Sequence, residues 1–312
     1  MTTSVTVRVP AKINLQLTVG PLRPDGYHDL VTVFHAVSLF DEVTVTPAER
    51  DSVLVAGEGA AEVPADSDNL ALRAVRALRA AVAARGTAVP GAGGPVREEI
   101  SKRIPVAAGM AGGSADAAAA IVACDALWGA GLPGSELSEV AALIGSDVPF
   151  ALLGGTAVGR GRGEQLTAIP AGPGRLHWVL GYADGHLSTP LVFKTLDQQR
   201  GDEPVPDPRL SEDLLAALRS GDPGRLAQAL SNDLQAPAVS LFPALRATLE
   251  AGRAAGALGA LVSGSGPTCF FLAGDARQAA DLAAGLSAAG ACRAVTIADG
   301  PARGAHVTTA GV

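Results

Sequence analysis

The chain has 312 residues, of which 48% are hydrophobic and 18% charged, and its formal net charge is −7. This length suffices for roughly two domains with their own cores, and the composition excludes an intrinsically disordered chain. The acidic balance lacks the basic surface expected of a protein that binds nucleic acid. We therefore expect a small-molecule ligand held at a local site and no nucleic-acid partner.

The apolar segments indicate neither a signal peptide nor a membrane span. The amino terminus has no uninterrupted apolar segment, and the longest uncharged stretch, residues 254–274, carries the polar sequence SGSGPT at its centre. This pattern favours strand, loop and strand. We expect a cytoplasmic protein without a membrane partner. Cys124, Cys269 and Cys292 have no metal-binding or redox spacing, so buried free thiols are expected.

The first predicted element is a long strand. Every odd position from 5 to 19 is apolar, which is typical of a half-buried strand, and Pro10 predicts a bend or a break within it. Lys12 and Asn14 occupy even positions. The same alternation therefore places both side chains on the polar face.

The other elements follow from apolar periodicity and from turn and cap residues. They predict an α+β fold with domains over residues 1–165 and 166–312 and a loose tail after about residue 301. The expected elements are a turn over residues 23–30, strand over 31–45, an amphipathic helix over 66–86, a helix ending near 128, a helix over 135–144, strands over 177–182 and 260–263, and helices over 211–219 and 277–289.

A loop of small residues precedes the helix that ends near residue 128. Almost every residue from Gly109 to Ser114 is small, and free amides at a helix amino terminus attract phosphate. The loop lacks the lysine of a P-loop and the later acidic residue of a dinucleotide fold. Phosphate binding and a close-packed glycine turn are therefore equally favoured by this loop alone.

A second glycine-serine loop, residues 263–267, lies between two apolar segments. By itself such a loop is more often a tight hairpin. Two such loops in one chain favour backbone amides from different domains that converge on one polyphosphate.

Lys12 and Asp147 are candidates for phosphoryl-transfer chemistry. A carboxylate can accept or orient a hydroxyl proton, and an ammonium can steer that carboxylate and offset charge on the transferred group. The alternatives are a solvated surface lysine and an aspartate that caps the next helical turn. Tyr27 and Phe193 can stack on a planar base, or they can pack in the core.

Three ordered motifs resemble those of the GHMP kinases: PAKINL from residue 10, PVAAGMAGGSA from residue 105 and SGSGP from residue 263. The sequences RPDGYHDL, GSDVPFAL, GRGEQL and STPLVFK extend the resemblance over most of residues 5–275. They are similar to the branch of the family whose acceptor is a polyol linked to cytidine diphosphate. The resemblance implies a ribosomal protein S5 domain 2-like N-terminal domain, a ferredoxin-like C-terminal domain and an active site between them.

The resemblance also implies an ATP-dependent kinase. Its small-molecule partners would be ATP and the cytidine-diphosphate-linked polyol, and Mg²⁺ would accompany the nucleotide without a dedicated protein ligand. Asp147 matches the catalytic aspartate, and Lys12 matches its partner lysine. The residues implied for ATP binding are Pro105, Val106, Ala107, Ala108, Gly109, Met110, Ala111, Gly112, Gly113, Ser114, Ala115, Asn69 and Leu70. The residues implied for acceptor binding are Asn14, Tyr27, His28, Lys102, Phe193, Ser265 and Gly266.

The glycine-rich loop departs from the family pattern. Ala108 and Ala111 stand where glycine is common, and Ala115 replaces a second serine, so one hydroxyl beside the phosphates is lost. We expect Asp116 to be a charge in the first helical turn rather than a metal ligand.

Two other functions remain open. A GHMP kinase for homoserine or mevalonate needs no surface for a base, whereas Tyr27, His28 and Phe193 favour a cytidylyl acceptor. A ligand sensor that has lost catalysis would need neither Lys12 nor Asp147, so their presence disfavours it. We expect a monomer or a weak homodimer.

Overall fold

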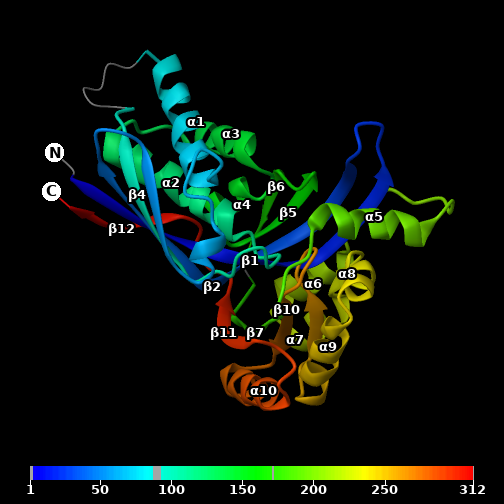
Figure 1. The fold of residues 1–312 in the computed structure, drawn as a ribbon. Helices are drawn as coiled ribbons and strands as arrows, with labels where there is room; N and C mark the ends of the chain where they lie inside the picture. The colour runs from blue at the N-terminus through cyan, green and yellow to red at the C-terminus, as the bar shows by residue number, and fades with distance from the viewer. Residues whose placement is uncertain (1–2, 87–92, 171, 312) are drawn as a thin grey trace.

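A computed structural model describes residues 3–86, 93–170 and 172–311 of the chain. In these residues the chain forms an eight-stranded mixed sheet and a four-stranded antiparallel sheet. We call the larger sheet with helices α1–α4 the larger body, and the smaller sheet with helices α5–α10 the smaller body (Figure 1). The predicted α+β class is confirmed.

The larger sheet is built around its first strand, β1 (Ser4–Leu22), which pairs antiparallel with β2 (His28–Pro47). The pairing register shifts between Pro10 and Ala11, where the sequence predicts a bend. Both faces of β1 are buried over its middle, because α2 covers one face and the smaller body approaches the other. The other strands are β3 (Ser52–Gly57), β4 (Val96–Lys102), β5 (Thr156–Gly161), β6 (Gln165–Ile169), β8 (Ser231–Asn232) and β12 (His306–Gly311).

The helices of the larger body pack around α2, which is buried along most of its length because its many alanines permit close approach. One side of α2 packs on α1, and the other packs on β1 and β2. The helices predicted over residues 66–86 and 135–144, and the helix predicted to end near 128, are confirmed. Their bounds are α1 (Leu70–Ala84), α2 (Gly112–Trp128), α3 (Gly134–Ile144) and α4 (Val148–Leu153), with a short 3₁₀ turn at Ala60–Glu62.

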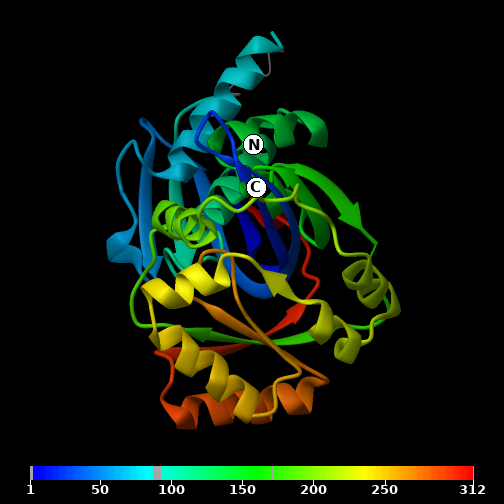
Figure 2. The ribbon, with the colours of Figure 1, turned by 90° about the vertical axis from the view of Figure 1, so that its right-hand side faces the viewer.

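The smaller body has the ferredoxin-like strand order. Its strands β7 (Leu176–Tyr182), β9 (Gly259–Val262), β10 (Cys269–Ala273) and β11 (Ala294–Gly300) lie in the order β11-β7-β10-β9. This sheet lies between the larger body and the helices α9 and α10 (Figure 2). The helices are α5 (Thr189–Arg200), α6 (Glu212–Ser220), α7 (Pro223–Ala229), α8 (Gln235–Leu241), α9 (Ala244–Ala254) and α10 (Ala276–Ala289).

The expected loose tail after residue 301 is wrong. Residues 306–311 form β12, which pairs antiparallel with the start of β1 and brings the two ends of the chain together (Figure 1). Most of β12 is exposed, so it carries no apolar alternation that could reveal it. The larger sheet also contains β6, which begins at the predicted domain boundary, and therefore draws on both predicted domains.

The uncharged stretch 254–274 contains β9, a loop and β10, as its sequence indicates. No helix in the described part of the chain is long and apolar enough to cross a membrane. The three cysteines are free; Cys124 and Cys269 are buried, and Cys292 is partly exposed.

Candidate active site

The glycine-rich loop before α2 packs directly against the loop between β9 and β10. Ser263 Oγ donates a hydrogen bond of 3.0 Å to the Gly109 carbonyl oxygen. A Cβ atom on Gly109 would lie 2.3 Å from the Ser263 carbonyl oxygen, and the φ angle of Gly109 is +73°. Only glycine fits there without displacing the neighbouring loop. The glycine-rich loop and the loop between β9 and β10, which the sequence analysis expected to converge on one polyphosphate, therefore lie side by side.

The next glycines let other parts of the larger body approach the start of α2. A Cβ on Gly112 would lie 3.1 Å from Lys102 Nζ, and one on Gly113 would lie 3.3 Å from Leu70 Cδ1. Ala111, the residue before α2, has no side-chain oxygen that could cap the first amides of the helix. These amides and the helix dipole favour an anion at this end.

Two residues of the predicted ATP loop turn into the core. Met110 is fully buried, Ala115 is 1% exposed, and the Ala115 amide donates to the Ala111 carbonyl oxygen at 2.8 Å. The alanine that replaces the second serine therefore faces the core and not a phosphate. Ala107 and Ala111 have φ angles of 50° and 60°, a left-handed conformation that costs an alanine about 1–2 kcal/mol.

A cavity of about 380 Å³ opens beside this loop. Pro105, Val106 and Ala108 line it from the glycine-rich loop, and Pro267 and Thr268 line it from the smaller body. The cavity therefore lies between the two bodies beside the glycine-rich loop, and neither Lys12 nor Asp147 is among its lining residues.

Lys12 on β1 and Asp147, the residue before α4, face each other. Lys12 Nζ lies 3.8 Å from Asp147 Oδ2, and the two side chains are 9% and 32% exposed. Asp147 occupies the N-cap position of α4, but its side chain accepts no capping hydrogen bond within the described residues. Burial lowers the pKa of Lys12 because it penalises the charged ammonium, and Asp147 acts in the opposite direction.

A directed chain of hydrogen bonds holds Lys12. Thr32 Oγ1 donates to the Gln16 carbonyl oxygen and accepts from Asn14 Nδ2, both at 2.8 Å. Asn14 Oδ1 then accepts from Lys12 Nζ at 2.8 Å. A Cβ on Gly264 would lie 3.2 Å from Asn14 Oδ1, so the second loop covers this chain. The Lys12 amide also donates to the Met110 carbonyl oxygen at 3.4 Å, so all three family motifs meet at Lys12.

The aromatic residues expected at the base gather at the far end of β1. The rings of His28 and Phe193 stack with centroids 5.5 Å apart. Tyr27 is 54% exposed, and the Arg162 guanidinium lies 5.4 Å from its ring centroid. We call Tyr27, His28 and Phe193 the base surface. Ser265, which was expected at the acceptor, bonds through its hydroxyl to Thr189 at the start of α5.

Two side chains that were expected to contact ligands, those of Lys102 and Asn69, are bonded to the protein itself. Lys102 has a 1% exposed side chain, and its Nζ lies 2.5 Å from Asp41 and 2.7 Å from Asp116. The Lys102 side chain is thus already paired with two protein carboxylates, and its expected role at the acceptor stays a prediction. Asp116 was expected as a charge in the first turn of α2, but it lies just beyond that turn and is buried against Lys102. Asn69 caps α1 and donates to the Pro64 carbonyl oxygen, so both ends of its amide are bonded.

Two buried acidic groups of the larger body, on α2 and β4, have raised pKa values. Burial raises the pKa of Asp116 to about 8, against the opposing charge of Lys102. Burial also raises the pKa of Glu98 to about 8, with Asp51 and Asp116 acting in the same direction. Neither carboxylate oxygen of Glu98 has a hydrogen-bond partner among the described residues. Glu98 is therefore a buried acid that favours its neutral form.

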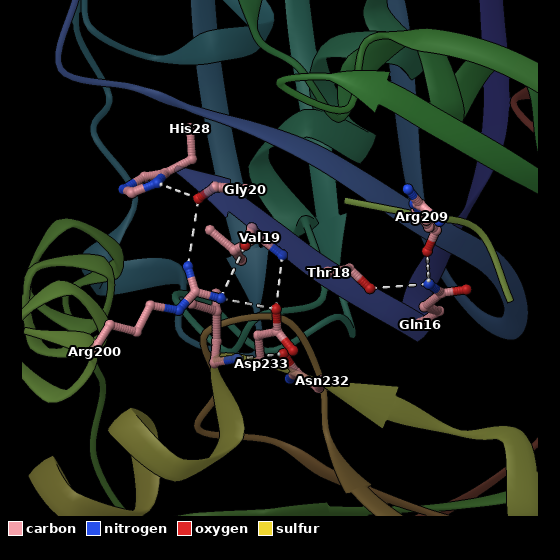
Figure 3. Close-up of polar contacts among 10 residues, drawn as sticks. Gln16, Thr18, Val19, Gly20, His28, Arg200, Arg209, Asn232 and Asp233 are labelled. Atoms are coloured by element: carbon pink, nitrogen blue, oxygen red, sulfur yellow. Dashed lines mark hydrogen bonds and ion pairs between the residues drawn. The ribbon is translucent and has the colours of Figure 1, made fainter. Parts of the chain in front are cut away.

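Several residues around the site escaped the sequence analysis. Thr32 orients Asn14, Asp197 Oδ2 lies 3.4 Å from His28 Nε2, and Arg200 and Asp233 hold the end of β1 (Figure 3). The available signal was the spacing of Phe193, Asp197 and Arg200, which places them on one helical face.

Comparisons with known proteins identify the family. Residues 69–155 match the GHMP kinases N terminal domain, and residues 214–292 match the GHMP kinases C terminal family. The chain belongs to the GHMP kinase family. Within this class, the chain is 55% identical over 304 residues to the 4-diphosphocytidyl-2-C-methyl-D-erythritol kinase of Streptomyces avermitilis, covering 97% of this chain and 99% of that protein.

Other known proteins are also similar to this chain. The chain is 58% identical over 313 residues to the protein of the same name from Thermobifida fusca, covering 98% of each. A crystal structure of 4-(cytidine 5'-diphospho)-2C-methyl-D-erythritol kinase is 35% identical, with a TM-score of 0.72 over 94% of this chain and 98% of that chain. A homoserine kinase from Cytophaga hutchinsonii, with a TM-score of 0.74 and 18% identity over 98% of each chain, shares the fold.

If Lys102 is a structural ion-pair partner, Lys102→Met should lower the free energy of unfolding by about 3–5 kcal/mol, because it leaves two buried carboxylates without their cation. Urea denaturation measures this change. The control Lys194→Met removes an exposed lysine and should change stability by less than about 0.5 kcal/mol. Unchanged stability together with a higher KM for the acceptor would contradict the structural role.

Glu98 should make stability depend on pH. Its raised pKa means that the folded state keeps a proton that the unfolded state releases, so stability falls as the pH rises from about 4.5 to about 8. Glu98→Gln should weaken this fall, and its stability advantage over the wild type should widen with pH. Urea midpoints across this window measure the effect, with Glu99→Gln on the exposed face of β4 as control. An undiminished pH slope in Glu98→Gln would refute the argument.

Proposed function

We propose that this chain is a kinase that transfers the γ-phosphoryl group of ATP to the 2-hydroxyl of 4-diphosphocytidyl-2-C-methyl-D-erythritol. The products would be ADP and the 2-phosphate, in the methylerythritol phosphate pathway of isoprenoid biosynthesis. The observation that carries this proposal is the base surface, in which His28 at the start of β2 stacks on Phe193 of α5 beside the end of β1, the strand that also carries Lys12. The near full-length relatives support it.

The chemistry follows from the positions of the charged groups. Asp147 is the more exposed partner, so its carboxylate can reach the acceptor hydroxyl and accept or orient its proton. Lys12 is buried and fixed by Asn14, so it can orient Asp147 and offset the negative charge that develops during transfer. The amides at the start of α2 would hold the phosphates of ATP. Catalysis would rest mainly on positioning and charge stabilisation.

The nucleotide would bring Mg²⁺ with it. The Ser114 hydroxyl and the Asp147 carboxylate are hard oxygen donors of the kind that Mg²⁺ accepts. The described residues hold no group of three or more His, Cys, Asp or Glu side chains suited to a metal ion. These donors fit a cation bound chiefly by the nucleotide phosphates, and the cation would neutralise charge on them. A monomer or weak homodimer stays a prediction.

The two alternatives are less well supported. Homoserine and mevalonate kinases share the fold at about 18% identity, but their acceptors have no base for His28 and Phe193 to contact. A sensor without catalysis would not need a buried lysine held by hydrogen bonds opposite an aspartate.

The acceptor can be tested by measuring ADP release with 4-diphosphocytidyl-2-C-methyl-D-erythritol, homoserine and mevalonate in turn, and with no acceptor as background. We expect release above background with the cytidylyl compound alone, because it alone can use the base surface. Release with homoserine or mevalonate instead would select the other kinases, and no acceptor-dependent release would favour the sensor.

Asp147→Asn should lower kcat by at least about 100-fold, because an amide cannot accept the hydroxyl proton. Nucleotide affinity, measured by titration calorimetry, should stay within about threefold, since the amides of the glycine-rich loop are untouched. Asp281→Asn, which neutralises an exposed aspartate on α10, is the matched control. Near-normal turnover by Asp147→Asn would contradict the catalytic role of Asp147.

A further inference from the structure

The end of β1 leaves backbone groups that β2 does not pair. The register between the two strands shifts between Val19 and Leu22. The Val19 amide donates to Asp233 Oδ2 at 2.8 Å, and its carbonyl oxygen accepts from Arg200 Nη2 at 2.9 Å. The Gly20 carbonyl oxygen accepts from His28 Nδ1 at 2.9 Å and from Arg200 Nη1 at 3.4 Å. Figure 3 shows Arg200 reaching these groups from α5.

Arg200 and Asp233 also bind each other. Arg200 Nη2 lies 3.1 Å from Asp233 Oδ2, and the two side chains are 21% and 33% exposed. The guanidinium fork therefore satisfies two backbone carbonyls and one carboxylate together, which a single-point cation could not do with the same geometry. The contact is specific to this place on β1 and not a general surface ion pair.

The position of Arg200 connects this cluster to the base surface. Arg200 is the last residue of α5, and Phe193 and Asp197 lie seven and three residues before it on the same face. Phe193 stacks on His28, and Asp197 contacts the other edge of that ring. His28 in turn donates to the same Gly20 carbonyl oxygen that accepts from Arg200. One face of α5 thus holds both His28 and the strand end that orients it.

We propose that Arg200 and Asp233 are positioning residues that hold α5 against the end of β1 and so place Phe193 relative to His28 for binding of the cytosine base. This inference rests on the proposed cytidylyl acceptor. Neither residue needs to touch the substrate. Loss of either would free the end of α5, and the stacking surface would lose its fixed geometry. The effect should therefore fall on acceptor binding and not on the phosphoryl-transfer step.

Steady-state kinetics of Arg200→Ala and Asp233→Ala test this separation. We expect the KM for the cytidylyl acceptor to rise about tenfold or more in each variant, because small displacements of positioned groups strongly weaken binding. The kcat and the KM for ATP should stay within about threefold. The double variant should be no worse than either single variant, because the two residues act as one unit.

The matched control is Arg225→Ala, which removes the arginine of an exposed ion pair with Asp222 on α7 and should leave all constants unchanged. If the alanine variants fail to fold, Arg200→Lys and Asp233→Asn keep part of the hydrogen bonding and should raise the acceptor KM less, in the same direction. A rise in the KM for ATP of equal size would show a general structural role and overturn the inference.

Thermal unfolding with CDP separates this inference from the proposed function. CDP should raise the Tm of the wild type and of Arg225→Ala, but much less that of Arg200→Ala, whereas an ATP analogue should protect all three alike. No protection of the wild type by CDP would overturn the cytidylyl acceptor, and with it this role of Arg200. Equal CDP protection of the wild type and Arg200→Ala would overturn the positioning role alone.

Discussion

The geometry of the site depends on the close approach of two loops from the two bodies. At Gly109 there is no room for a side chain, because the carbonyl oxygen of Ser263 occupies the place of a Cβ atom. The same contact brings Gly264 against Asn14 and Lys12. The small residues of the glycine-rich loop therefore let the neighbouring loop pack where larger side chains would otherwise project. Their amides at the start of α2 remain available to a phosphate, so packing and anion binding are compatible roles of one segment.

Two buried lysines show how partners decide what a charged side chain can do. Lys102 lies between two carboxylates within hydrogen-bond distance, and its side chain is closed to a ligand. Among the described residues, Lys12 has an amide oxygen at 2.8 Å and one carboxylate at 3.8 Å, which is itself partly exposed. Its ammonium is therefore less closely paired with carboxylates than that of Lys102. An incompletely paired cation is what a negatively charged transition state can use.

The sequence predicted the parts of the fold that carry periodic patterns. Alternation reveals β1, caps and an apolar stripe reveal α1, and motif order reveals the family. Pairing between distant buried charges has no such pattern, since Asp41 lies within a strand and meets Lys102 only through the sheet. The exposed strand β12 also has no alternation to detect. The ion pairs of Lys102 were therefore not foreseen from its place beside a motif, whereas Lys12 and Asp147, which the motifs single out, do lie near each other.

Asn232 and Asp233 link the two halves of the site through one peptide bond. Asn232 donates to the carbonyl oxygens of Val262 and Gly264, beside the loop that covers Lys12. Asp233 holds the end of β1 next to the base surface. An acceptor that places its base at one end and its reacting hydroxyl at the other must span a fixed distance. Because an error of about 1 Å at the reacting atoms can cost about 100-fold in rate, a short covalent connection between the two holding points limits that error more effectively than two independent contacts.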